Sequence, residues 1–189
     1  MIRIALVGDI GSGKSYYANL FGYPVFNADL IVAEIYKKNK KCFNQLNRKL
    51  PNYFSSFPLK KKELINCILA NKTNLKKITE IIHPLVKKKM KLFINKNKAK
   101  RCVVLDIPLF FENKLNRKDD VIVFIQSSKK DIIKKLKKRK NYNQKLIDKF
   151  KQFQISSKIK KKKSNFVIKN SFNHKKALKE INNVIREII

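Results

Sequence analysis

The chain has 189 residues, 43% of them hydrophobic, and 46 Lys and Arg against 13 Asp and Glu give a formal net charge of +33. This length suits one compact domain with an inserted subdomain, and the apolar content excludes a disordered chain. Three scattered cysteines, Cys42, Cys67 and Cys102, exclude a disulfide framework and a Cys-x-x-Cys metal site. The apolar runs are too short for a signal peptide or a membrane span. We therefore expect a cytoplasmic monomer with reduced thiols.

The basic excess has two explanations. A large positive charge is typical of proteins that bind nucleic acids. The chain is also rich in Asn and Ile and has only 4 Gly and 5 Pro. AT-rich codons produce this composition, and they also place Lys at exposed positions without selection by a partner. The lysine runs at 60–62, 87–89 and 160–163 contain no interleaved aromatic residues and no recognisable nucleic-acid-binding motif. We therefore favour the compositional explanation and expect no nucleic-acid partner.

The first forty residues predict the start of an α/β fold. Residues 2–7 are a β-branched apolar run that ends at glycine, which is typical of a buried strand. Helical spacing follows over 14–21, a second short strand over 24–26, and helical spacing again over 30–36. Strand, helix and strand in this order predict a doubly wound parallel sheet.

The middle of the chain predicts a helical insertion. Between residues 42 and 100 the apolar residues recur at three- and four-residue steps, with no strand signal: Ile65, Ile68, Leu69, Leu75, Ile78, Ile81 and Ile82. Because this segment interrupts the α/β alternation, we expect it to pack beside the sheet as a substrate-binding subdomain.

The last third returns to the α/β pattern. Strands are predicted over 101–106, 121–125 and 166–168, and amphipathic helices over 129–139 and 174–189. The predicted organisation is an α/β core of residues 1–40, 101–139 and 164–189, a helical insertion of residues 41–100, and a polar lid of residues 140–163.

A phosphate-binding motif follows the first predicted strand. Gly8-Asp9-Ile10-Gly11-Ser12-Gly13-Lys14-Ser15 fits G-x-x-x-x-G-K-[ST] at every position, between a strand and a helix. Glycines let backbone N–H groups converge on phosphate oxygens, the lysine adds a positive charge, and the serine offers a hydroxyl to Mg²⁺. The predicted ATP-binding residues here are Gly11, Ser12, Gly13, Lys14, Ser15 and Tyr16.

A kinase is favoured over a GTPase or an ATPase. The chain has no Asn-Lys-x-Asp segment that would read guanine and no Asp-x-x-Gly switch after a strand. It has instead a carboxylate, Asp29, just after the second predicted strand, and a basic stretch late in the chain that suits a lid over phosphates.

Several further segments resemble the dephospho-coenzyme A kinase family in order and spacing. With the phosphate-binding motif they are Asn27-Ala28-Asp29, His83-Pro84-Leu85, Ile107-Pro108-Leu109-Phe110-Phe111-Glu112-Asn113, and Gln154 followed by Asn165-Phe166-Val167-Ile168-Lys169-Asn170-Ser171. The resemblance implies a parallel sheet of about five strands, a helical substrate domain and a lid. It also implies transfer of phosphate from ATP to the ribose 3′-hydroxyl of dephospho-coenzyme A, the last step of coenzyme A synthesis.

Catalytic roles follow from the chemistry and from this resemblance. Asp29, Lys14 and Arg139 are the predicted catalytic residues: the carboxylate orients the acceptor hydroxyl and the two cations neutralise phosphate charge. Helix capping is the alternative role of Asp29. Mg²⁺ is the expected metal, held by Ser15 and by Asp106 at the end of a predicted strand.

The resemblance places the remaining site residues around the two substrates. His83, Pro108 and Glu112, with Asp29, are expected on the side of dephospho-coenzyme A, and Lys160 and Asn170 on the side of ATP. Glu112 is expected to touch the substrate or to order its own loop. The chain departs from the family pattern at several positions, which are Asp9, Asn27, Lys160, Lys169 and Phe172. Asp9 brings a carboxylate close to the triphosphate, where it repels phosphate, pairs with a lid lysine or points to solvent.

Two other functions remain as alternatives. The first is a kinase of the same architecture that acts on another nucleoside or nucleotide. The second is a nucleic-acid-binding P-loop protein that uses the positive charge, which predicts salt-dependent binding and ATP turnover stimulated by RNA or DNA.

Overall fold

The computed structural model describes residues 1–139 and 142–189, which form two compact units. The first contains residues 1–27 and 97–189, and the second contains residues 28–96. The strands are β1 (Ile2–Val7), β2 (Val25–Asn27), β3 (Cys102–Asp106), β4 (Val121–Gln126) and β5 (Phe166–Lys169). The helices are α1 (Lys14–Leu20), α2 (Ala28–Lys38), α3 (Lys40–Lys49), α4 (Lys61–Ala70), α5 (Asn74–Lys96), α6 (Lys129–Lys137), α7 (Gln144–Lys151), α8 (Ser157–Lys162) and α9 (His174–Ile188).

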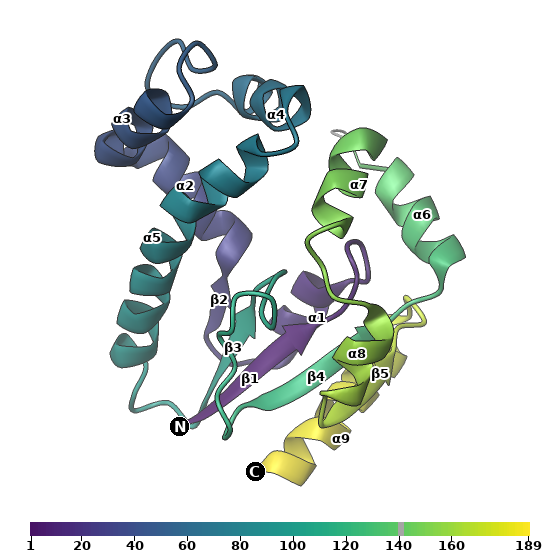
Figure 1. Cartoon of the computed structure of the whole chain (residues 1–189). Helices are drawn as coiled ribbons and strands as arrows, with labels where there is room; N and C mark the ends of the chain where they lie inside the picture. The colour runs from purple at the N-terminus through teal and green to yellow at the C-terminus, as the bar shows by residue number, and fades with distance from the viewer. Residues whose placement is uncertain (140–141) are drawn as a thin grey trace. The chain divides into compact units, whose positions relative to one another are not determined.

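The first unit is built on a five-stranded sheet in the order β2-β3-β1-β4-β5 (Figure 1). Every neighbouring pair is parallel; Ile4, for example, is in register with Val104 of β3 and with Val121 of β4. The sheet confirms the predicted α/β class. Because the strands are parallel, their carboxyl ends lie at one edge, and the chain reverses its direction of winding beside β1. Ligands of open α/β sheets bind at this edge.

The main hydrophobic core lies between the sheet and two helices that cover the same face, α1 and α9 (Figure 1). Tyr17 and Ala18 of α1 and Ile181 of α9 pack here against side chains from four strands. The central strands β1 and β3 are buried almost end to end, as expected of a parallel sheet. This core fixes α1, and therefore the loop that joins β1 to α1, against the sheet.

The second unit contains α2, α3, α4 and α5, which are mutually packed. Its boundaries fall at residues 28 and 96, so the unit begins earlier than the predicted insertion, because α2 packs against α3 and α5. Pro84 lies inside the long helix α5. A proline there removes one helical hydrogen bond, since it has no N–H to donate to the carbonyl four residues earlier.

Residues 142–163 of the predicted lid form α7 and α8. Lys140 and Asn141, its first two residues, lie outside the described part of the chain. Each of the two helices begins at a side-chain cap: Asn143 accepts from the N–H of Leu146, and Ser156 accepts from the N–H of Ile159. Among the described residues, no helix is long and apolar enough to span a membrane. All three cysteines are buried free thiols.

Candidate active site

The loop of residues 8–15 joins the end of β1 to the start of α1, and we call it the phosphate loop. Its glycines adopt backbone angles that other residues avoid: φ is 151° at Gly8 and 97° at Gly13. A Cβ at Gly8 would lie 2.6 Å from the carbonyl oxygen of Ile125, and one at Gly13 would lie 2.7 Å from Nδ2 of Asn170. Both positions therefore require glycine, for conformation and for space.

Lys14 is the first residue of α1, and its side chain folds back over the phosphate loop. Its Nζ donates to the carbonyl oxygens of Gly8 at 3.1 Å and of Asp9 at 2.9 Å. The side chain is buried although it is charged, with 8% of the residue exposed. The ammonium group is therefore held at the loop, next to the amino-terminal end of α1, which favours anions.

Asn170, which follows β5, supports the phosphate loop through its side chain. Its Nδ2 donates to the carbonyl of Ser12 at 2.8 Å, and its Oδ1 accepts from the N–H of Phe172 at 2.8 Å and from the hydroxyl of Tyr17 at 3.3 Å. Ser127, which directly follows β4, donates to the same carbonyl of Ser12 at 2.9 Å. Asn170 was expected on the side of ATP, and the structure places it as a support of the loop.

Asp106 is the last residue of β3, beside the phosphate loop. It is 3% exposed and accepts hydrogen bonds from Nδ2 of Asn27 at 2.8 Å and from Ser15. Burial raises the pKa of Asp106 above the ordinary carboxyl value, although the Ser15 hydrogen bond and the charge of Lys14 act in the opposite direction. A carboxylate beside a serine hydroxyl supplies the hard oxygen ligands that suit Mg²⁺, which binds proteins through few carboxylates together with substrate phosphates.

The loop after β3 contacts the chain between α7 and α8. The N–H of Ile155 donates to Oε1 of Glu112 at 2.9 Å, and Nε2 of Gln154 donates to the carbonyl of Pro108 at 3.4 Å. Lys160 of α8 is 1% exposed, and its Nζ lies 3.7 Å from Oε1 of Glu112. The structure thus brings together Pro108, Glu112 and Lys160, which the sequence had assigned to two different substrates.

Asp9 also contacts α8. Its Oδ1 accepts a hydrogen bond from Oγ of Ser157 at 2.5 Å, so its partner in the lid is a serine and not the lysine that was one expectation. Ser127 was not among the predicted site residues. Its position directly after a buried strand, at the edge where the carboxyl ends meet, was the available signal.

Two further predicted residues of this unit are exposed. Tyr16 lies in the first turn of α1, and its hydroxyl forms a hydrogen bond of 2.7 Å with Nδ1 of His174. Arg139 follows the end of α6, where its N–H donates to the carbonyl of Leu136. Near it on α6, the ammonium of Lys135 lies 4.9 Å from the centre of the Phe172 ring.

Asp29 and His83 belong to the helical unit. Asp29 is exposed and is the second residue of α2, so it lies in the first turn and not at the capping position before the helix. A carboxylate there is stabilised by the helix dipole. His83 is half-buried in α5, directly before Pro84, and burial lowers its pKa from 6.5.

Comparisons with known proteins agree with this geometry. A family model described as dephospho-CoA kinase matches residues 2–176. The dephospho-CoA kinase of Bartonella quintana (strain Toulouse) is 31% identical over 170 residues, 87% of each chain. That of Wolbachia pipientis wMel is 29% identical over 187 residues, 96% of this chain and 95% of that protein.

Two solved structures share the fold. TT1252 from Thermus thermophilus has a TM-score of 0.77 at 24% identity and covers 100% of this chain and 98% of its own. The dephospho-CoA kinase from Campylobacter jejuni has a TM-score of 0.66 at 24% identity and covers 98% and 96%. Since the family model matches nearly the whole length, and the phosphate loop is formed as its motif predicts, this chain belongs to the dephospho-CoA kinase family.

Proposed function

We propose that the protein transfers the γ-phosphoryl group of ATP to the ribose 3′-hydroxyl of dephospho-coenzyme A. One observation supports the phosphoryl-transfer chemistry of this proposal. The glycine-rich loop holds the Lys14 ammonium beside a buried carboxylate, Asp106, which is hydrogen-bonded to Ser15. Polyphosphate with a divalent cation is the ligand that this combination suits. The family supplies the identity of the acceptor.

In this proposal the phosphate loop and α1 bind the triphosphate. Gly11, Ser12 and Gly13 and the ammonium of Lys14 surround the phosphates, Tyr16 lies on the same side of the site, and Asn170 acts there by supporting the loop. Ser15 and Asp106 would hold Mg²⁺ directly or through water. When bound, Mg²⁺ supplies charge that neutralises the β- and γ-phosphate oxygens.

The acceptor side is assigned to residues that the family resemblance singles out. Asp29 orients the 3′-hydroxyl and accepts its proton, and His83, Pro108 and Glu112 shape the substrate side. Arg139 and Lys160 neutralise the charge that develops on the transferring group. Lysine lacks the planar two-pronged grip of arginine, so the larger share falls to Arg139.

A panel of acceptors tests the proposed function. ADP release is measured with dephospho-coenzyme A, AMP, CMP and nucleosides, for the parent protein and for Asp29→Asn. Of these acceptors, we expect only dephospho-coenzyme A to be phosphorylated. Asp29→Asn should lower kcat by about a hundredfold or more, with little change in ATP affinity. Turnover with a nucleotide and none with dephospho-coenzyme A would replace this proposal by a nucleotide kinase.

We also propose that the protein works in the cytoplasm. The three cysteines support this, because they are buried, unpaired and distributed over both units. Burial raises the pKa of Cys42 to about 11, so this thiol stays protonated and unreactive at neutral pH. A reducing compartment preserves thiols of this kind.

A further inference from the structure

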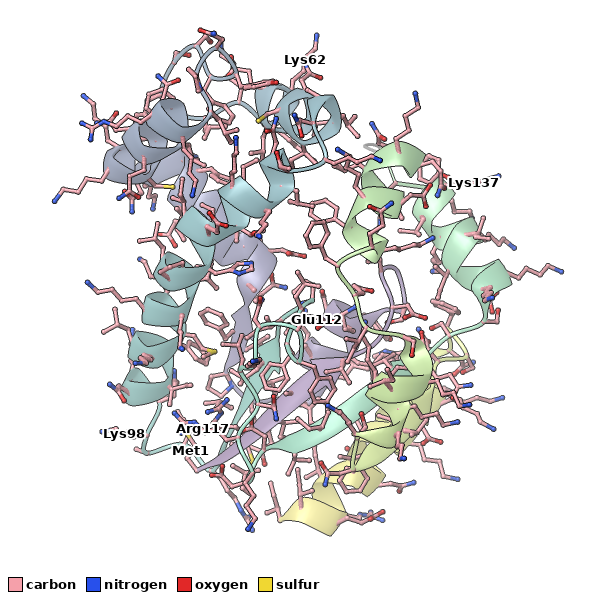
Figure 2. The ribbon with its side chains drawn as sticks, in the orientation of Figure 1. Met1, Lys62, Lys98, Glu112, Arg117 and Lys137 are labelled. Carbon is pink, nitrogen blue, oxygen red and sulfur yellow. The ribbon has the colours of Figure 1, made fainter. Side chains whose placement is uncertain are left out.

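The short helix α8 is held at two points, and the holding group at each is a carboxylate. Oγ of Ser157, at its first residue, donates to Oδ1 of Asp9 in the phosphate loop at 2.5 Å. Nζ of Lys160, three residues later and on the same side of the helix, lies 3.7 Å from Oε1 of Glu112. We call these four residues the α8 clamp. Figure 2 labels Glu112, which lies beside the chain that joins α7 to α8.

The burial of Lys160 is the unusual feature of the clamp. The lysine is 1% exposed, and among the described residues its Nζ has no hydrogen-bond partner. An ammonium group carries three donors. Removing such a charge from water is unfavourable, and one ion pair longer than a hydrogen bond offsets only part of that cost. A buried cation with unused donors is suited to an anionic ligand that completes its hydrogen bonds.

Glu112 acts on both the position and the charge of this lysine. The same Oε1 that faces Lys160 accepts the N–H of Ile155 at 2.9 Å, so the carboxylate fixes the chain that enters α8. Asp9 links α8 to the phosphate loop in a similar way. Its carboxylate accepts from Ser157, while its main-chain carbonyl accepts from Nζ of Lys14 at 2.9 Å. One residue of the loop therefore contacts both Lys14 and the helix that carries Lys160.

We propose that Asp9 and Glu112 are positioning residues, which hold α8 so that the ammonium of Lys160 is directed at the transferring phosphoryl group. This inference rests on the proposed function, and it gives Glu112 a role through Lys160 in place of direct contact with the acceptor. Preorganised charge is most effective on the charge that develops in the transition state. The clamp should therefore control turnover more than ATP affinity.

Glu112→Gln tests the clamp with the least disturbance, because the amide oxygen still accepts from Ile155 and only the charge facing Lys160 is lost. We expect kcat to fall about tenfold or more while the KM for ATP changes by less than about twofold. Amide hydrogen exchange over residues 152–160 should become at least several times faster. Glu187→Gln, the same change at an exposed position of α9, is the matched control and should leave both measurements unchanged.

A double-variant comparison separates a positioning role from a general loss of structure. Lys160→Met alone should reduce kcat, and adding Glu112→Gln to it should reduce kcat no further, because Glu112 acts on turnover through Lys160. Asp9→Ala, which removes the acceptor of the Ser157 hydroxyl, should accelerate exchange over the same residues and lower kcat, with exchange in β1 and β3 unaffected.

The outcomes distinguish this inference from the function on which it rests. The clamp is refuted if Glu112→Gln leaves kcat and exchange within about twofold of the parent, or if the losses of the two single variants simply add. It is also refuted as a positioning device if exchange rises and kcat does not fall. If the parent protein shows no turnover of dephospho-coenzyme A, the proposed function fails, and the exchange comparison alone then decides whether the clamp exists.

Discussion

Asp106 combines two requirements that act against each other. A ligand for Mg²⁺ has to be ionised, and yet this carboxyl group lies at the buried end of β3, where burial raises its pKa above the ordinary value of 3.8. The folded protein therefore holds the proton of Asp106 at pH values at which the unfolded chain has released it. Ionisation of Asp106 consequently lowers the stability of the fold as pH rises through and above the ordinary carboxyl range. In the proposed function, the charge of Asp106 therefore serves Mg²⁺ binding and not the stability of the fold.

Asp106→Asn should separate these two effects. The amide can still accept from Asn27 and contact Ser15, so we expect the variant to be more stable than the parent at pH 7. The difference should shrink as pH falls and the parent carboxyl takes up its proton as well. Mg²⁺-dependent turnover should drop roughly ten- to a hundredfold. Urea unfolding between pH 4 and 8 measures the first effect, and a stability difference that does not vary with pH would contradict it.

At the scale of elements, the end of α6 provides the exposed arginine of the predicted site. Arg139→Ala should lower kcat by about a hundredfold or more and change ATP affinity much less, because an arginine of this kind acts on charge that develops in the transition state. Steady-state kinetics with separate kcat and KM values measures this. Lys138→Ala, the neighbouring exposed cation, is the matched control and should have little effect. Equal small effects of both substitutions would argue against the role of Arg139.

The helix α5 contains a pH-sensitive position at His83. Burial lowers the pKa of His83 below 6.5, so the unfolded chain takes up a proton more readily than the fold does. Stability is therefore complete above pH 6.5 and decreases as pH falls below that value. His83→Gln should be less sensitive to acid between roughly pH 5 and 7. Urea unfolding of both proteins by circular dichroism checks this, and parallel pH profiles would count against it.

The order of the elements was predictable from the sequence because their apolar patterns are local. Residues 2–7 were expected as a strand and form β1, and the strand expected over 166–168 forms β5, one residue longer. The burial of Lys160 was not predictable from local pattern. It belongs to a run of four lysines, which is the pattern of a solvated helix face. Its burial and its ion pair with Glu112 depend on segments distant in sequence. The hydrogen bond between Asp9 and Ser157 was not predictable for the same reason, because the two residues are distant in sequence.

At the scale of the whole molecule, the lysines behind the charge of +33 are distributed along the whole sequence and are not confined to one segment. Figure 2 shows the side chains of Lys62, Lys98 and Lys137, on three different segments, extending away from the ribbon. A field of this kind attracts anionic substrates at long range and is screened by salt.

We expect kcat/KM for dephospho-coenzyme A to fall severalfold between about 0.02 and 0.2 M salt, with kcat nearly constant. Added polynucleotide should not stimulate ATP turnover. Initial rates over a salt series measure the first effect, and strong stimulation by RNA or DNA would favour the nucleic-acid-binding alternative.

The central position of β1 has a consequence for how the protein is made. The strand that leads into the phosphate loop is synthesised first, but its two neighbours, β3 and β4, begin at Cys102 and Val121. Until those residues have left the ribosome, both edges of β1 lack partners, whereas α2 to α5 are already complete and contact one another. We therefore expect the helical unit to acquire structure first on the nascent chain. The nucleotide-binding end of the sheet should assemble later, when β3 and β4 pair with β1.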